Sequence, residues 1–217
     1  MHSYKTHVVR IKRKYIFEDG YKELSKIADL RGKMHIVFIN ELGNVEDGQD
    51  AGGLFKEFLT QLIEIVFNPD YGLFITTPVD LELFPNPNSR ALFGQEDLNF
   101  YRFLGRILGR AVYDGITVNP QFARFFLRKL IGKSNSLNDL ESLDHQLFKQ
   151  LNFLRNYDGD VGDLEMYFSI SEENLATGQT KEVNLVPNGS EVKVTNQNKF
   201  RYIYMMADYR LNRRIKE

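Results

Sequence analysis

The residue types that carry most enzyme chemistry are sparse in this sequence and stand at no catalytic spacing. The chain has 217 residues, four histidines and no cysteine, so these residues supply no thiolate nucleophile, disulfide or cysteine-bound metal. No histidine lies at zinc-ligand spacing from another histidine or a carboxylate. Neither a Gly-x-Ser-x-Gly elbow nor a phosphate-binding loop is present. We therefore expect no catalytic residue, metal or cofactor within these residues.

Adjacent carboxylates could serve acid–base chemistry, but charge in this chain has a simpler interpretation. The acidic pairs Glu46-Asp47, Glu96-Asp97 and Glu172-Glu173 suit helix starts, where negative charge complements the helix dipole. The basic run over residues 10–14 is more simply a solvated face than a nucleic-acid patch, since the formal net charge is −1. No run of about 18 apolar residues occurs. We expect a binding domain with neither nucleic acid nor membrane as a partner.

The elements that would position a binding site are those of an α+β, mainly helical domain. Apolar residues form 42% of the chain, enough for a substantial core. Apolar residues spaced three and four apart predict helices over residues 54–67, 96–113 and 120–131. Asp50 is expected to cap the first of these, and Asn68-Pro69 to end it.

Gly105 and Gly109 lie one turn apart within the second predicted helix. Each costs about 1 kcal/mol relative to alanine at such a position. We therefore expect a packing reason for them, namely the close approach of another backbone.

The character of the chain changes after Gly132. Two short helices are predicted over residues 137–156, followed by strands over 165–170, 182–185 and 191–194. Asn188-Gly189 predicts a hairpin turn between the last two strands, because both residues tolerate a positive φ. A final helix is expected from Lys199 to the end, capped by Thr195 or Asn196.

Four sequence blocks carry a further pattern. They run from Asp50-Ala-Gly-Gly to Gly-Leu-Phe74, from Phe100 to Tyr113, from Leu140-Glu-Ser-Leu-Asp144 to Tyr157-Asp-Gly-Asp160, and over Val194-Thr-Asn-Gln-Asn198. In this order the blocks resemble the N-terminal lobe of HECT-type ubiquitin ligases, and they look nearest the branch of ubiquitin-protein ligases 3B and 3C.

The resemblance implies a two-lobed ligase of which this chain is the first lobe. The large subdomain would span residues 1–134, a small subdomain that docks a ubiquitin-conjugating enzyme 135–200, and the start of the next helix 201–217. The absent second lobe would carry the cysteine that takes ubiquitin as a thioester and passes it to a substrate lysine. The implied partners are the conjugating enzyme, ubiquitin, and substrates bound elsewhere in the full-length protein, in the cytoplasm or nucleus.

This chain alone is then expected to be inactive, and its missing cysteine to reflect truncation. The alternative is a non-catalytic interaction or scaffold fragment. In that case an unpartnered final helix would leave its apolar face partly exposed. That face consists of Tyr202, Ile203, Met206 and Leu211.

By resemblance, the docking surface consists of Leu147, Gln150, Leu151, Asp163, Leu164 and Tyr202. Leu147 and Leu151 are four residues apart and so share one helix face. The alternative is that Leu147, Leu151 and Leu154 belong to the core, because an apolar helix face is more often core than interface. The acidic residues Asp158, Asp160, Asp163 and Glu165 could steer a basic partner.

Asn68 and Tyr71 match positions that hold a second, non-covalent ubiquitin in some family members. The competing interpretation is structural. Asn68-Pro69 would end a helix and Tyr71 would pack a turn.

Overall fold

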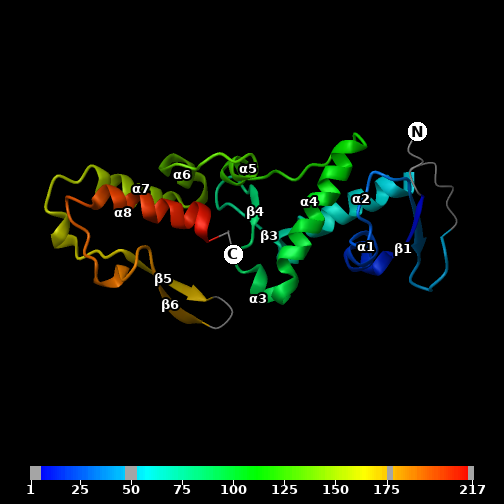
Figure 1. Ribbon diagram of the computed structural model, residues 1–217, viewed down its shortest axis with the longest axis horizontal. Helices are drawn as coiled ribbons and strands as arrows, with labels where there is room; N and C mark the ends of the chain where they lie inside the picture. Colours follow the sequence, from blue (N-terminus) through cyan, green and yellow to red (C-terminus); the bar gives the residue numbers. More distant parts are fainter. Residues whose placement is uncertain (1–5, 47–52, 175–177, 215–217) are drawn as a thin grey trace. The chain divides into compact units, whose positions relative to one another are not determined.

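The computed structural model describes residues 6–46, 53–174 and 178–214 of the chain (Figure 1). Its helices and small sheets confirm the predicted α+β, mainly helical class. The chain packs as two compact units. One contains the described residues of Met1–Ile75 together with Asn88–Gln121, and the other contains Thr76–Pro87 with the described residues of Phe122–Glu217. The predicted subdomain boundary after residue 134 is a different division and stays a prediction.

The first unit is built around a two-stranded parallel sheet and the helices that cover one of its faces. Strands β1 and β2 pair in parallel, and alternate residues such as Val9, Ile11, Ile36 and Phe38 are buried. Helix α1 packs on β1, and α2 packs on both β2 and α1. The elements of this unit are β1 (His7–Lys12), α1 (Ile16–Leu24), β2 (Met34–Ile39), α2 (Gly53–Val66), α3 (Ser89–Phe93) and α4 (Asp97–Tyr113), and β3 (Phe74–Thr76) ends at its boundary.

Helices α2 and α4 confirm the helical spacing of their apolar residues. The buried stripe of α2 includes Phe58, Leu59 and Leu62, each with an exposed fraction of 0%. The chain leaves that helix at Asn68, whose side-chain oxygen accepts a hydrogen bond from the amide of Asp70. The predicted cap Asp50 lies outside the described residues.

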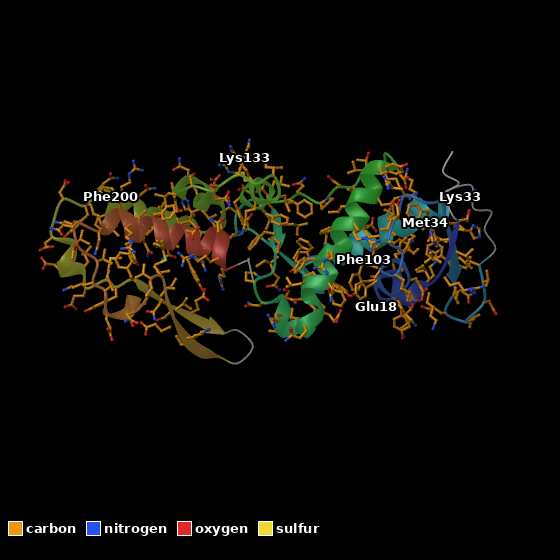
Figure 2. All side chains as sticks on the ribbon, viewed as in Figure 1. Glu18, Lys33, Met34, Phe103, Lys133 and Phe200 are labelled. Carbon is orange, nitrogen blue, oxygen red and sulfur yellow. The ribbon has the colours of Figure 1, made fainter. Side chains whose placement is uncertain are left out.

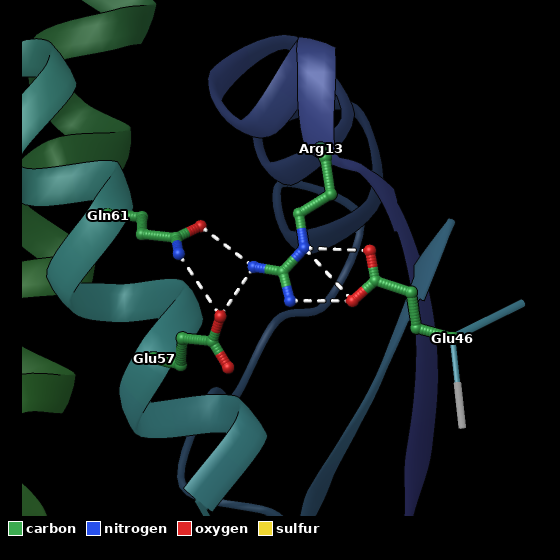
Figure 3. Close-up of polar contacts among 4 residues, drawn as sticks. All are labelled: Arg13, Glu46, Glu57 and Gln61. Carbon is green, nitrogen blue, oxygen red and sulfur yellow. Dashed lines mark hydrogen bonds and ion pairs between the residues drawn. The ribbon is translucent and has the colours of Figure 1, made fainter. Parts of the chain in front are cut away.

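Arg13 ties the end of β1 to two other segments of this unit (Figure 3). Its guanidinium lies over the ring of Phe38, 3.6 Å from the centroid. Its Nη2 donates to Glu46 Oε2 at 2.7 Å, and its Nη1 donates to Glu57 and Gln61 on α2. One half-buried cation therefore joins β1, the segment that follows β2, and α2. The two carboxylates raise the pKa of Arg13, while Arg13 lowers the pKa of Glu46.

The second unit contains the region that the sequence marks as a docking subdomain. Helices α7 and α8 lie side by side within it, and β5 and β6 form an antiparallel pair (Figure 1). Its elements are β4 (Leu83–Pro85), α5 (Arg124–Leu130), α6 (Leu140–Leu143), α7 (His145–Arg155), β5 (Ser169–Asn174), β6 (Gln179–Asn184) and α8 (Lys199–Asp208), which continues as a π-helical turn over Tyr209–Arg213.

The helix predicted over residues 120–131 begins later than expected. Phe122 forms a parallel bridge with Leu83, and the amide of Ala123 donates to the carbonyl of Leu83 at 2.8 Å. These tertiary hydrogen bonds hold the chain extended through Ala123, so α5 starts only at Arg124.

The hairpin predicted at Asn188-Gly189 is wrong. The antiparallel pair is formed by β5 and β6 instead, and only Lys193 of the predicted strand 191–194 forms a bridge, to Tyr167. Asn188 does take a positive φ of 53°, but a 3₁₀ turn (Gly189–Glu191) follows it. Gly189 is required because an added Cβ would stand 2.0 Å from the carbonyl oxygen of Phe168.

The packing reason expected for Gly105 and Gly109 is also wrong as far as the described residues extend. Both glycines are exposed on α4, and a Cβ added to either would meet nothing within 4 Å.

Within the described ranges, no helix is both long and apolar enough to cross a membrane.

Replacing two of these glycines by alanine should change stability in opposite directions. Gly189→Ala should lower the free energy of unfolding by about 3 kcal/mol, because its methyl group collides with backbone. Gly109→Ala should raise it by about 0.5–1 kcal/mol, because an exposed helix interior favours alanine. Urea unfolding monitored by circular dichroism measures both changes. Equal effects of the two variants would contradict the packing described here.

Acid should weaken the first unit through Glu46. Arg13 holds the pKa of this carboxyl below its ordinary value of 4.5. A lowered folded pKa stabilises the fold above the unfolded pKa, and this contribution disappears as pH falls through the folded value. Glu46→Gln should therefore flatten the fall in unfolding free energy below pH 4.5. The control Glu64→Gln changes an exposed carboxylate on α2 and should retain the wild-type slope. An unchanged slope in Glu46→Gln would refute this role.

Candidate functional site

The candidate site lies on α7 and α8, which polar contacts join at both ends. Asp144 Oδ1 accepts the amide of Leu147 at 3.0 Å and so caps the first turn of α7. Asp144 Oδ2 accepts Arg210 Nη2 at 2.6 Å. At the opposite end of α7, Lys199 Nζ donates to the carbonyl of Tyr157 at 2.8 Å. The two helices therefore run antiparallel, and their relative position is fixed at two points.

Asn196 holds the segment that follows α7 against the approach to α8. It was expected as a helix cap, but its Oδ1 accepts the amide of Val161 at 3.0 Å and its Nδ2 donates to the carbonyl of Gly159 at 3.2 Å. Asn198 occupies the N-cap position of α8 instead. Asp160 caps a 3₁₀ turn (Val161–Leu164) by accepting the amide of Gly162 at 2.8 Å. This turn places Leu164 beside α7 and α8.

These elements enclose an apolar groove of about 490 Å³. Leu151, Leu154 and Tyr202 form its buried floor, with exposed fractions of 2%, 2% and 5%. Phe153 and Leu164 stay open to solvent, at 63% and 38% exposed. We call this feature the α7–α8 groove, and it is lined by Leu147, Lys149, Gln150, Leu151, Phe153, Leu154, Leu164, Met166 and Tyr202.

The structure brings together five of the six docking residues named from sequence. Leu147, Gln150, Leu151, Leu164 and Tyr202 line the α7–α8 groove. Asp163 is the sixth, and it is exposed and outside the lining. The core interpretation of Leu151 and Leu154 holds as well, because buried side chains form the floor. The binding role of all six residues stays a prediction.

Sequence reasoning missed Phe153 and Met166 in the groove lining. Phe153 carried a signal, since a phenylalanine next to Leu154 on one short helix cannot share its buried face. Met166 carried none. It reaches the groove because the amide of Val194 bonds its carbonyl at 2.8 Å and so fixes the segment after the 3₁₀ turn.

Tyr202 contributes a buried aromatic ring to the floor of the groove. Its ring meets Phe168 edge-on, with the centroids 5.4 Å apart. Burial raises the pKa of its phenol, so Tyr202 stays neutral at physiological pH. Its part in the groove is therefore apolar contact rather than proton transfer.

The acidic side chains near the groove face solvent, although Asp160 also accepts the amide of Gly162. Asp158, Asp160, Asp163 and Glu165 are all exposed, and none forms an ion pair with a described residue. They lie between α7 and Met166 in the chain, in the segment that carries Leu164.

Within the described ranges, no three histidine or carboxylate side chains gather to hold a metal ion.

Asn68 and Tyr71 both have local structural tasks in the first unit. Asn68 caps the 3₁₀ turn Pro69–Tyr71, and the Tyr71 ring stacks near Phe93 with the centroids 5.8 Å apart. Burial, and then the charge of Glu18, raises the pKa of Tyr71 to about 12. These contacts support the structural interpretation. The ubiquitin-binding role stays a prediction.

The final helix does not expose its apolar face. Ile203, Met206 and Leu211 have exposed fractions of 5%, 4% and 1%. The partial exposure expected for a fragment without partners is therefore absent at these residues. Packing inside the second unit covers them, and Arg213 closes the turn by donating to the carbonyl of Leu185.

Comparison with known proteins finds relatives that match nearly the whole chain. The profile of the HECT-domain (ubiquitin-transferase) family matches residues 60–217. The chain is 43% identical over 210 residues to E3 ubiquitin-protein ligase UPL6 of Arabidopsis thaliana, covering 96% of the chain and 20% of that protein. It is 39% identical over 218 residues to human ubiquitin-protein ligase E3B, covering 97% and 20% respectively. The chain thus spans a fifth of the length of these relatives.

Removing the Asp144 carboxylate should loosen α7 from α8. Asp144→Ala loses both the helix cap and the Arg210 pair and should cost about 3 kcal/mol of unfolding free energy. Asp144→Asn keeps an acceptor for the cap and should cost about half as much. Asp158→Ala, at an exposed position, should stay within about 0.5 kcal/mol of wild type in the same urea titration. A cost for Asp144→Ala no larger than that of Asp158→Ala would exclude this role.

Proposed function

Because the chain belongs to the HECT-type ubiquitin-transferase family, we propose that its α7–α8 groove binds a ubiquitin-conjugating enzyme. In the full-length protein, ubiquitin would then pass to a cysteine outside this chain and on to a substrate lysine, by acyl transfer through a thioester. These 217 residues contain no cysteine, so their own part in that reaction is docking. Residues 135–200 would form the docking subdomain.

The observation that carries this proposal is the open apolar wall of the α7–α8 groove. Phe153 and Leu164 remain exposed beside a floor that is fully buried. Burying such side chains against a partner releases water from apolar surface. A pocket with a buried tyrosine in its floor and several leucines in its lining suits a protruding aromatic or aliphatic side chain, the kind of anchor that dominates protein interfaces.

Charge supports the same proposal. The four exposed acids Asp158, Asp160, Asp163 and Glu165 belong to the segment that also supplies Leu164. Negative charge beside an apolar pocket raises the rate of encounter with a partner that surrounds its anchor with basic residues. Asp163 would thus act through long-range attraction, which agrees with its place outside the groove lining.

A weak and transient complex is expected. The groove is small, and association costs consume much of the energy that a small interface provides. A dissociation constant of about 1 μM or weaker is therefore reasonable. A scaffold role without enzyme docking is the alternative, and the buried face of α8 removes the observation that would have favoured it.

Phe153→Ala should weaken binding of a conjugating enzyme at least about tenfold, because it removes the exposed wall of the groove. This position tests binding better than Leu151 or Tyr202, since truncating those buried side chains would also destabilise the fold. The measurement is calorimetric or fluorescence titration of the chain with a broad panel of conjugating enzymes.

The matched control is Phe200→Ala. Phe200 lies at the start of α8, is 61% exposed and does not line the groove (Figure 2). It should bind as wild type does. Equal weakening by both variants, or no binding to any member of the panel, would count decisively against the α7–α8 groove as the docking site.

A further inference from the structure

The outer edge of β1 carries backbone groups that have no partner among the described residues. The amide of His7 donates to the carbonyl of Lys33, just before Met34 at the start of β2 (Figure 2). In a parallel pair this register turns the backbone of alternate residues toward the partner strand, and the remaining residues turn away. Val8 and Arg10 are therefore the residues whose N–H and C=O groups face outward. No described residue bonds to them.

The next outward-facing amide along β1, that of Lys12, already has a hydrogen-bond acceptor. Lys12 N–H also faces away from β2, but it donates to Asp19 Oδ2 at 2.9 Å. The open length of the edge is thus limited to the stretch from Val8 to Arg10, enough to pair with a short extended segment. Unpaired strand edges of this kind are templates for an added strand.

The sheet face above this edge is also uncovered. The face with Val9 and Ile11 is buried, whereas Val8 on the opposite face is 59% exposed and Val37 is half-buried. Parallel sheets are normally covered on both faces, and two strands alone are marginal. As far as the described residues extend, the sheet is therefore open on one face and one edge at the same place.

Charge defines the class of partner. Arg10 and Lys12 project from the same open face as Val8 and are exposed. Neither forms an ion pair with a described residue. Opposite charges directly across two strands are stabilising, and like charges are destabilising. An added strand that pairs with Val8 to Arg10 should therefore carry an apolar side chain opposite Val8 and an acidic one opposite Arg10. A second acid just beyond the paired stretch can reach the side chain of Lys12.

We propose that the outer edge of β1 binds an extended acidic segment of a partner protein as a third strand. Side chains on one face of a strand recur every second residue, so the recognised pattern is an apolar residue and two acids at alternate positions. This surface belongs to the first unit and is separate from the α7–α8 groove. Its test is therefore independent of the conjugating-enzyme proposal.

The probes are two fluorescein-labelled peptides, Thr-Val-Thr-Glu-Thr-Glu-Thr and its reversed sequence, titrated against the chain by fluorescence anisotropy. One orientation should bind saturably and protect the amides of Val8 and Arg10 from hydrogen exchange. The charge-reversed double variant Arg10→Glu, Lys12→Glu should bind it at least about tenfold more weakly. That variant should gain binding to the same peptide with lysines in place of the glutamates.

Two controls separate strand addition from simple charge attraction. The variant Lys22→Glu, Lys56→Glu makes the same charge change at exposed positions on α1 and α2 and should bind as wild type does. N-methylation of alternate peptide amides should abolish binding in one set and spare it in the other, because only one set faces β1.

The proposal is overturned if neither peptide binds, if both methylated sets bind equally, or if the control variant loses as much affinity as the β1 variant. Self-association of the chain that Arg10→Glu abolishes would also overturn it, since the occupant would then be a second copy.

Discussion

The α7–α8 groove depends on the carboxylate of Asp144. One of its oxygens accepts the amide of Leu147 in the first turn of α7. The other accepts a hydrogen bond from Arg210, which follows α8 in the chain. Because α7 has only three turns, its own backbone hydrogen bonds cannot fix its position, and packing and capping must do so. With α7 fixed, Phe153 stays in solvent while Leu151 and Leu154 stay buried. The proposed partner would need the groove open before it arrives, and the contacts of Asp144 hold α7 and α8 in that arrangement.

The first unit uses the same device in another place. Arg13 is a cation with four donors occupied by side chains from two other segments, and its flat face covers Phe38. In both units, then, a charged group is half-buried and shared among elements distant in sequence. Breaking one partner leaves the remaining charge poorly solvated, which makes each cluster more consequential than an exposed ion pair.

Sequence reasoning succeeded where the physical cause is local. Apolar spacing predicts α2 and α4, and family motifs bring out five residues that line one groove. It failed where distant backbone decides. The bridge between Leu83 and Phe122 delays α5, and the carbonyl of Phe168 rather than a hairpin turn explains Gly189. Neither contact produces a pattern in the neighbouring sequence from which it could be predicted. The exposure of Phe153 could be predicted only in part from the sequence, because the prediction requires knowing which side of α7 is covered by other elements.

The division of the chain into two units has a consequence for its synthesis. Each unit combines two separate stretches of sequence, so the first stretch of each must wait for the second before that unit can be completed. Strand β4 emerges early, yet the groups that bond Leu83 lie at Phe122 and Ala123. At roughly 5–20 residues per second, the bonds between Leu83 and this later segment can form only several seconds after β4 has been synthesised. During that interval Phe84 also lacks the ring of Phe125, so two side chains that are buried in the folded chain remain accessible to water.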